Sequence, residues 1–259
     1  MSETKSDDIK QDSRATEHNS EDDCRINLNK IDVGHIIKFP EPHKRQHNIC
    51  CYTETIPLQI LFSAYLQGVF PWFNEDEGEP VFWYSPDPRF CLQMEKLHVP
   101  KSIDKFLKHT PYVYTMDEDF VGVMEGCRNM NRAGQTGTWI GPKMIDAYTK
   151  FHKAGFAHSV EVWHDGQLAG GLYGVLIGSV FCGESMFTKE SDSAKSAFVL
   201  FARAFASCGG KLIDSQVYTD NIARYGAANI SRQAFLRLEE QYLYQPLNGD
   251  LKKTFENSL

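Results

Sequence analysis

The sequence lacks the long apolar run that a membrane-spanning helix needs. No stretch approaches about 18 uninterrupted apolar residues, and the first residues are charged where a secretion signal is apolar. The 259-residue chain is 42% hydrophobic and 24% charged, which is typical of globular proteins with one large domain or two small ones. We therefore expect a cytoplasmic protein.

Regularly spaced cysteines are also lacking. Seven cysteines, an odd number, favour reduced thiols over disulfides. The nearest metal pattern is "HKRQHNICC", which holds His43, His47, Cys50 and Cys51, but no second ligand pair follows at a zinc-finger distance. We predict no metal site, although spacing alone does not determine whether these four side chains bind a metal ion.

Motifs for phosphates and activated nucleophiles are absent as well. The sequence has no P-loop, no H-E-x-x-H and no G-x-S-x-G elbow. The glycines of "GGLYGVLIG" fall inside a predicted hairpin and not between a strand and a helix, so they are no dinucleotide fingerprint. These absences exclude the commonest nucleotide-binding, zinc-protease and esterase classes.

Charge is acidic overall, and its distribution is uneven. The net charge is −7, and residues 1–30 hold five Lys or Arg against eight Asp or Glu. This polar segment is too poor in apolar side chains to fold, so we predict a disordered tail. The acidic total argues against a general nucleic-acid binder but is compatible with a local basic patch.

Apolar periodicity predicts an α+β fold with helices packed on a mainly antiparallel sheet. The turns Asp165-Gly166 and Gly178-Ser179 separate alternating segments, as in a meander. The expected helices are 55–68, 101–109, 141–155 and 194–210, and the expected strands are 158–164, 167–177, 180–187 and 211–218.

Two of the expected helices carry lysines along one side. These lysines are Lys101, Lys105 and Lys108 in the first helix, and Lys143, Lys150 and Lys153 in the second. Spacing alone favours an ordinary solvated face over a binding surface.

Polar side chains interrupt two of the expected strands. Asp214 and Gln216 lie two residues apart in "KLIDSQVY" and should point to the same side of a strand, with Ser215 on the other. Glu184 sits in the apolar "FCGESMF", where a carboxylate must be paired, hydrated or functional. Periodicity alone favours a structural hydrogen-bond network of these three over a catalytic one.

Nine ordered motifs between residues 36 and 240 resemble the bacterial leucyl/phenylalanyl-tRNA protein transferases. They are "FPEP", "AYLQGVFPWF", "WYSPDPR", "LHVPKSI", "TWI", "AHSVEVW", "GGLYGV", "FCGESMF" and "GGKLIDSQV". After the tail predicted at 1–30 from its composition, the resemblance implies a small N-terminal domain at 31–88 and a catalytic domain similar to the GNAT acyltransferases at 89–259. A true acetyltransferase needs a glycine-rich loop for coenzyme A, and "TKESDSAK" at that place has none, so no cofactor is expected.

The resemblance also implies an activity and its partners. Leu, Phe or Met would move from aminoacyl-tRNA to the α-amine of proteins that begin with Arg or Lys, which marks them for N-end rule degradation. The lysines Lys101, Lys105, Lys108, Lys143 and Lys150 would then contact the tRNA acceptor stem through its phosphates.

Site residues follow from the same resemblance. Asp214 would polarise Gln216 toward the incoming amine, and Glu184 would bind or orient that amine. The donor side chain would enter an apolar pocket of Leu172, Phe181 and Met186, and the terminal adenosine would stack on Trp72 and Trp139.

Departures from the family pattern keep alternatives open. "RYGA" at 224–227 stands where the family usually has "SLGA", Tyr84 replaces a usual Trp, and Ser215 replaces a Cys. A GNAT-like acyltransferase with another donor, or a non-catalytic module that binds tRNA ends or protein N-termini, remain the other hypotheses. Donor and acceptor preference, oligomeric state and the role of the tail are not determined by the sequence.

Overall fold

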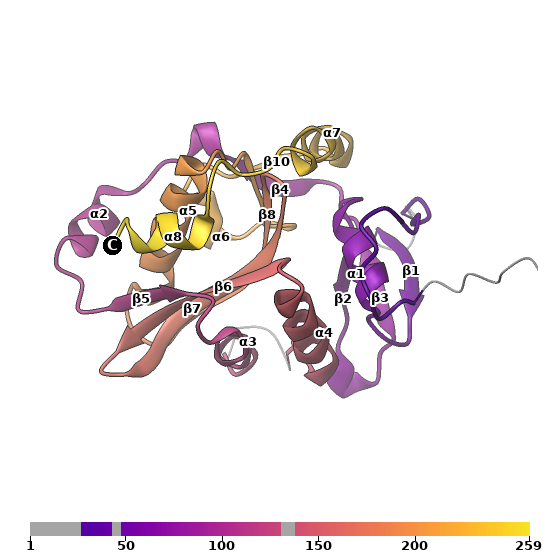
Figure 1. Cartoon of the computed structure of the whole chain (residues 1–259), viewed down its shortest axis with the longest axis horizontal. Helices are drawn as coiled ribbons and strands as arrows, with labels where there is room; N and C mark the ends of the chain where they lie inside the picture. Colours follow the sequence, from indigo (N-terminus) through magenta and orange to yellow (C-terminus); the bar gives the residue numbers. More distant parts are fainter. Residues whose placement is uncertain (1–26, 43–47, 131–137) are drawn as a thin grey trace, which may run out of the picture.

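The computed structural model describes residues 27–42, 48–130 and 138–259. Most of the predicted tail, and both His43 and His47, therefore lie outside the described residues. Within the described part, a small antiparallel sheet stands beside a large mixed sheet (Figure 1). The small sheet has the order β1-β3-β2, with β1 at Ile49–Thr53, β2 at Phe70–Trp72 and β3 at Val81–Tyr84.

The large sheet has the order β10-β4-β9-β8-β7-β6-β5. Every neighbouring pair is antiparallel except β8 and β9, which run parallel. Its strands are β4 Arg89–Gln93, β5 Val113–Met116, β6 Ala157–His164, β7 Gln167–Ile177, β8 Val180–Thr188, β9 Leu212–Asp214 and β10 Ala228–Ile230.

Helices cover both faces of this sheet. In Figure 1, α5 and α8 lie on one face, and α3 and α4 lie on the other. The described helices are α1 Leu58–Tyr65, α2 Lys101–Leu107, α3 Phe120–Arg128, α4 Pro142–Lys153, α5 Ser193–Ser207, α6 Asp220–Ala223, α7 Arg232–Leu243 and α8 Leu251–Glu256, with short 3₁₀ turns at Glu75–Glu77 and Met94–Lys96.

Alternation along the strands divides the core into two clusters. Leu172 of β7 packs with α5 and α8, whereas the next residue, Tyr173, packs with α3 and α4 on the other face. The second cluster also contains Phe62 of α1 and Trp83 of β3, so the small sheet shares its core with α4. The domain boundary at residue 88 stays a prediction.

The predicted α+β class, with a small N-terminal part and a mixed sheet flanked by helices, is confirmed. The predicted helices at 101–109, 141–155 and 194–210 and the meander of β6, β7 and β8 are present. Among the helices of the described residues, none has the length and apolar character to cross a bilayer.

The strand predicted at 211–218 is wrong beyond Asp214. β9 ends there, and Gln216 adopts a left-handed backbone with φ of 57°. A left-handed residue breaks the pleat, so the alternation of faces does not continue past this point.

Candidate active site

A pocket opens where β8 and β9 separate. The two strands pair in parallel over only three positions, from Val180 with Leu212 to Cys182 with Asp214. Beyond that pairing, Gly183 to Phe187 of β8 and Ser215 to Val217 after β9 line opposite walls of a cavity of about 570 Å³. Two strands that diverge from a shared pairing thus create the site without a separate loop.

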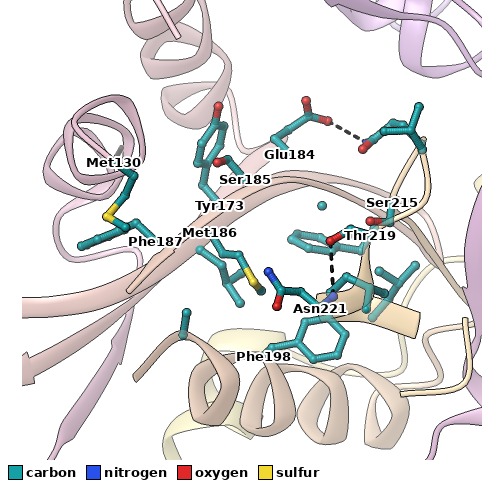
Figure 2. A pocket seen from close by; sticks show the side chains of 18 of the residues that line it. Met130, Tyr173, Glu184, Ser185, Met186, Phe187, Phe198, Ser215, Thr219 and Asn221 are labelled. Atoms are coloured by element: carbon teal, nitrogen blue, oxygen red, sulfur yellow. Dashed lines mark hydrogen bonds between the residues drawn. The ribbon is translucent and has the colours of Figure 1, made fainter. Parts of the chain in front are cut away.

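Glu184 lies at a β-bulge on the β8 wall. Tyr173 of β7 pairs with Ser185 and Gly174 pairs with Gly183, so Glu184 is the extra residue of β8. A bulge re-aims the side chain it carries. In Figure 2, Glu184 points across the upper part of the pocket, and a dashed line marks its hydrogen bond to the opposite wall.

The Glu184 carboxyl group holds its proton more strongly than an ordinary glutamate does. Burial raises its pKa from 4.5 to about 8, because a carboxylate there loses most of its hydration. Hydroxyl groups of Tyr65 and Tyr148 favour the ionised form and limit the rise, while the negative charge of Asp214 adds to it. Tyr65 of α1 and Tyr148 of α4 also hydrogen-bond to each other.

Gln216 has two orientations of its carboxamide that satisfy different partners. In one, Nε2 donates to Oε1 of Glu184 at 3.3 Å. In the other, the nitrogen donates to the carbonyls of Gly183 and Ser215, both at 3.1 Å, and the amide oxygen turns toward Glu184. The second orientation suits a protonated Glu184, which has an O–H to donate, and the first suits the carboxylate.

Asp214 is not on the pocket wall, which corrects the expectation that it shares a face with Gln216. It is completely buried, and both carboxylate oxygens accept from Arg89, at 2.8 and 2.6 Å. Oδ1 also accepts from the backbone N–H of Gln216 at 3.0 Å. Ser215, predicted to face away, lines the pocket instead.

The neighbours of Asp214 in the sheet are two thiols. Cys91 of β4 lies beside Asp214 on one side, and Cys182 of β8 lies beside it on the other. Burial raises the pKa of both thiols, to about 12 for Cys91, and the charge of Asp214 contributes. The described cysteines form no disulfides, and no group of three His, Cys, Asp or Glu in the described ranges is placed to hold a metal ion.

All five residues predicted to bind substrate line this one pocket. Leu172 and Phe181 are buried, and Met186 is half-buried beside them. Trp72 is 39% exposed, packs edge-on against Tyr84 with ring centres 5.7 Å apart, and provides an aromatic surface at the mouth. The remaining apolar lining includes Phe198, Ile213, Ile222 and Tyr225.

The predicted tRNA-binding lysines are exposed, but none lines the pocket. Lys143 and Lys150 project from α4, which begins three residues after the pocket residue Trp139. Lys150 also pairs with Asp146 at 2.6 Å. Lys101, Lys105 and Lys108 belong to α2 and its cap, well apart from α4 in Figure 1.

Sequence reasoning missed several residues of the site. Arg89 lay in the quoted motif "WYSPDPR", but nothing in its spacing identified Asp214 as its partner. Tyr65 and Tyr148 looked like core residues of helices, and Lys195 at the start of α5, which lines the pocket, lay in "TKESDSAK", a segment noted only for its lack of glycines. These contacts join segments far apart in sequence, so periodicity carries no signal for them.

Two family models match the chain. The model described as leucyl/phenylalanyl-tRNA protein transferase covers residues 91–240, and the model of that family's N-terminal domain covers residues 56–87.

Curated relatives agree with the family models. Proteins named leucyl/phenylalanyl-tRNA–protein transferase are 47% identical in Myxococcus xanthus over 80% of this chain and 88% of the relative, and 45% identical in Laribacter hongkongensis over 76% and 83%. The Shigella sonnei relative of the same name is 41% identical over 85% of this chain and 92% of its own.

Solved structures match the chain only weakly. A GCN5-related N-acetyltransferase-like protein from Streptococcus suis aligns with a TM-score of 0.34 and 12% identity, over 64% of this chain and 61% of the other. The family models, in contrast, cover β2 and β3 of the small sheet, most of the large sheet and every residue that lines the pocket. The chain therefore belongs to the leucyl/phenylalanyl-tRNA protein transferase family and is an aminoacyltransferase.

Proposed function

We propose that this chain transfers Leu, Phe or Met from aminoacyl-tRNA to the α-amine of proteins that begin with Arg or Lys, which marks those proteins for degradation. One observation carries the proposal. A single pocket joins an apolar cavity, an aromatic surface at its mouth, and the carboxyl group of Glu184 beside the carboxamide of Gln216.

The apolar part of the pocket suits the donor side chain. Leu172, Phe181 and Met186 offer no charged group, and shape alone discriminates poorly between apolar side chains of similar size. Trp72 and Trp139 are available for stacking with the terminal adenosine, an interaction worth about 1 to 3 kcal/mol per base. The ester that joins the donor amino acid to the adenosine would then lie near Glu184 and Gln216.

Proton transfer to Glu184 is the first chemical step of the proposal. An α-ammonium group has a pKa of about 7.7 to 8.0, close to the value of about 8 for Glu184. Proton transfer between groups of matched pKa costs little free energy, so the ionised carboxylate can take the amine's proton at neutral to mildly alkaline pH.

The neutral amine then attacks the ester carbonyl carbon. A C–N bond forms and leaves the nitrogen positively charged, the C–O bond to the ribose breaks, and Glu184 returns its proton to the departing ribose oxygen. The Glu184 carboxylate then takes the second proton from the nitrogen, which becomes a neutral amide, and releases this proton to solvent. With Glu184 protonated, the carboxamide nitrogen of Gln216 donates to the carbonyls of Gly183 and Ser215, and its oxygen is turned into the pocket, where it accepts a hydrogen bond from the incoming amine and orients it. Because the ester is already activated, placing the two reactants together contributes much of the rate.

Asp214 acts in this scheme through the backbone. It is buried behind the pocket wall and accepts from the N–H of Gln216, so it holds that residue in its left-handed conformation. This role replaces direct polarisation of the Gln216 side chain.

The lysines provide the electrostatic contact with tRNA. We assign Lys143 and Lys150 to phosphates near the acceptor end, because α4 follows the pocket residue Trp139 closely. Lys101, Lys105 and Lys108 are assigned to a more distant part of the acceptor stem, since α2 lies away from α4 (Figure 1). These contacts read charge and shape, not base sequence.

A transfer assay tests the proposal. The purified protein is incubated with labelled Leu-, Phe-, Met- or Arg-tRNA and with peptides that begin with Arg, Lys, Asp or Glu. We expect transfer of the first three amino acids to the Arg and Lys peptides, and a large loss in Gln216→Ala. The absence of transfer from every donor would overturn the proposed function, and transfer of Arg to Asp or Glu peptides would overturn the specificity.

A further inference from the structure

Arg89 is the one buried cation among the described residues near the pocket. Its side chain is 2% exposed and uses three nitrogens. Nε and Nη2 donate to the two oxygens of Asp214, and Nη1 donates to the carbonyl of Gly68 at 2.8 Å. The guanidinium also lies over the ring of Phe235, 4.4 Å from its centre, and 5.2 Å from the ring centre of Phe70.

These contacts reach both walls of the pocket. On one wall, Asp214 also accepts a hydrogen bond from the backbone N–H of Gln216, so Arg89 is linked to Gln216 through Asp214. Gly68, with a left-handed φ of 63°, is the turn that leads into β2, which carries Phe70 and Trp72 on the other wall. The guanidinium of Arg89 therefore links β9 of the large sheet to the turn before β2 of the small sheet. The described strands of the two sheets form no ladder with each other.

We propose that Arg89 is a positioning residue for aminoacyl transfer, which fixes Gln216 relative to the adenosine-stacking surface of Trp72. The inference rests on the proposed function. Asp214 would supply the anchor on one wall and the Gly68 carbonyl the anchor on the other. Arginine suits this task because its rigid fork donates in several fixed directions, whereas lysine is a point charge on a flexible stem.

Glu239 of α7 supports a one-to-one pairing of Arg89 with Asp214. Its side chain is 2% exposed, and burial raises its pKa well above the ordinary range. Its Oε1 has no hydrogen-bond partner among the described residues. A neutral Glu239 leaves the guanidinium to balance a single carboxylate, which favours the bidentate geometry.

Arg89→Lys is the main test, and Arg203→Lys is the matched control. Arg203 also pairs with an aspartate, Asp104, but it is exposed on α5 away from the pocket lining. We expect kcat for Leu transfer to fall about 100-fold in Arg89→Lys, as small misplacements of reacting groups do, and to stay within about threefold in the control. Each rate is divided by the folded fraction measured by circular dichroism.

Chemical rescue separates positioning from simple loss of structure. Arg89→Ala leaves a cavity of the shape of the missing group, so millimolar guanidinium should restore its kcat at least tenfold. The same salt should leave Gln216→Ala unchanged. If Arg89→Ala does not fold, Arg89→Lys decides the matter alone.

Adenosine binding, followed by tryptophan fluorescence, gives a readout that does not need transfer. We expect about tenfold weaker binding in Arg89→Lys than in Arg203→Lys. A folded Arg89→Lys with kcat and adenosine affinity near wild type would overturn the role of Arg89, as would a loss of rate that only follows the folded fraction. An inactive wild-type protein would instead count against the proposed function, and adenosine binding would still judge Arg89.

Discussion

Replacing Glu184 by Gln should stabilise the protein, and increasingly so as the pH rises. The pKa of Glu184 is about 8 in the folded protein, whereas an unperturbed glutamate, as in the unfolded chain, has a pKa of 4.5. Between these values the unfolded chain has lost the proton and the folded chain keeps it, so the free energy of unfolding falls by about 1.4 kcal/mol for each pH unit. The full penalty above pH 8 is roughly 5 kcal/mol.

Glutamine keeps the shape and hydrogen-bonding capacity of the protonated acid but cannot ionise. The difference in unfolding free energy between Glu184→Gln and wild type should therefore be small near pH 4.5, grow steadily up to about pH 8, and then level off. Other titrating groups, Glu239 among them, are common to both proteins and cancel in the difference.

Urea denaturation at pH 5, 6, 7, 8 and 9, followed by tryptophan fluorescence, measures this difference. Glu240→Gln, on the exposed side of α7, is the control and should not show the trend. A difference that stays constant from pH 5 to 9 would refute the reasoning, because it would mean that Glu184 ionises equally well in both states. The same substitution should lower the transfer rate, since stability and catalysis make opposite demands on this carboxyl group.

Three further predictions concern the substrates. Lys143→Glu together with Lys150→Glu should weaken tRNA binding and reduce the slope of log affinity against log salt by about 2, as filter binding at several salt concentrations would show; an unchanged slope would contradict the α4 assignment. Trp72→Ala should weaken binding of an aminoacyl-adenosine by about 1 to 3 kcal/mol in a fluorescence titration, and equal affinity would remove Trp72 from the adenosine site. Met186→Ala should lower kcat/KM for Leu about tenfold and less for Phe, and equal losses for both donors would argue against a pocket wall at this position.

Local periodicity predicted most of the helices and strands because each of them buries one face. The helix at Ser193–Ser207 and the three-stranded meander have strong alternation or helical spacing over many residues. Arg89–Gln93 and Arg232–Leu243 were not predicted, and both pack on the site. Their role depends on partners far away in the chain, which spacing does not encode.

The sequence predicted which residues belong to the candidate site but not how their side chains are arranged. Alternation placed Asp214 and Gln216 on one face, yet the left-handed backbone at Gln216 puts the carboxylate behind the wall and the carboxamide in it. Glu184 was noticed because a carboxylate in an apolar strand is costly. The bulge that aims it, and the tyrosines that moderate its pKa, arise from pairing between strands and from tertiary packing.

The thiols on either side of Asp214 allow opening of the centre of the sheet to be measured by thiol alkylation. Cys91 and Cys182 are buried, and their raised pKa values keep them as unreactive thiols while β4, β9 and β8 stay together. Cys50 and Cys51 of β1 are only partly buried, so an alkylating reagent reaches them first. Cys127 and Cys208 are buried as well, so both are first replaced by Ala. The slow phase of alkylation then measures how often the strands around Asp214 separate, and bound aminoacyl-adenosine should lengthen it.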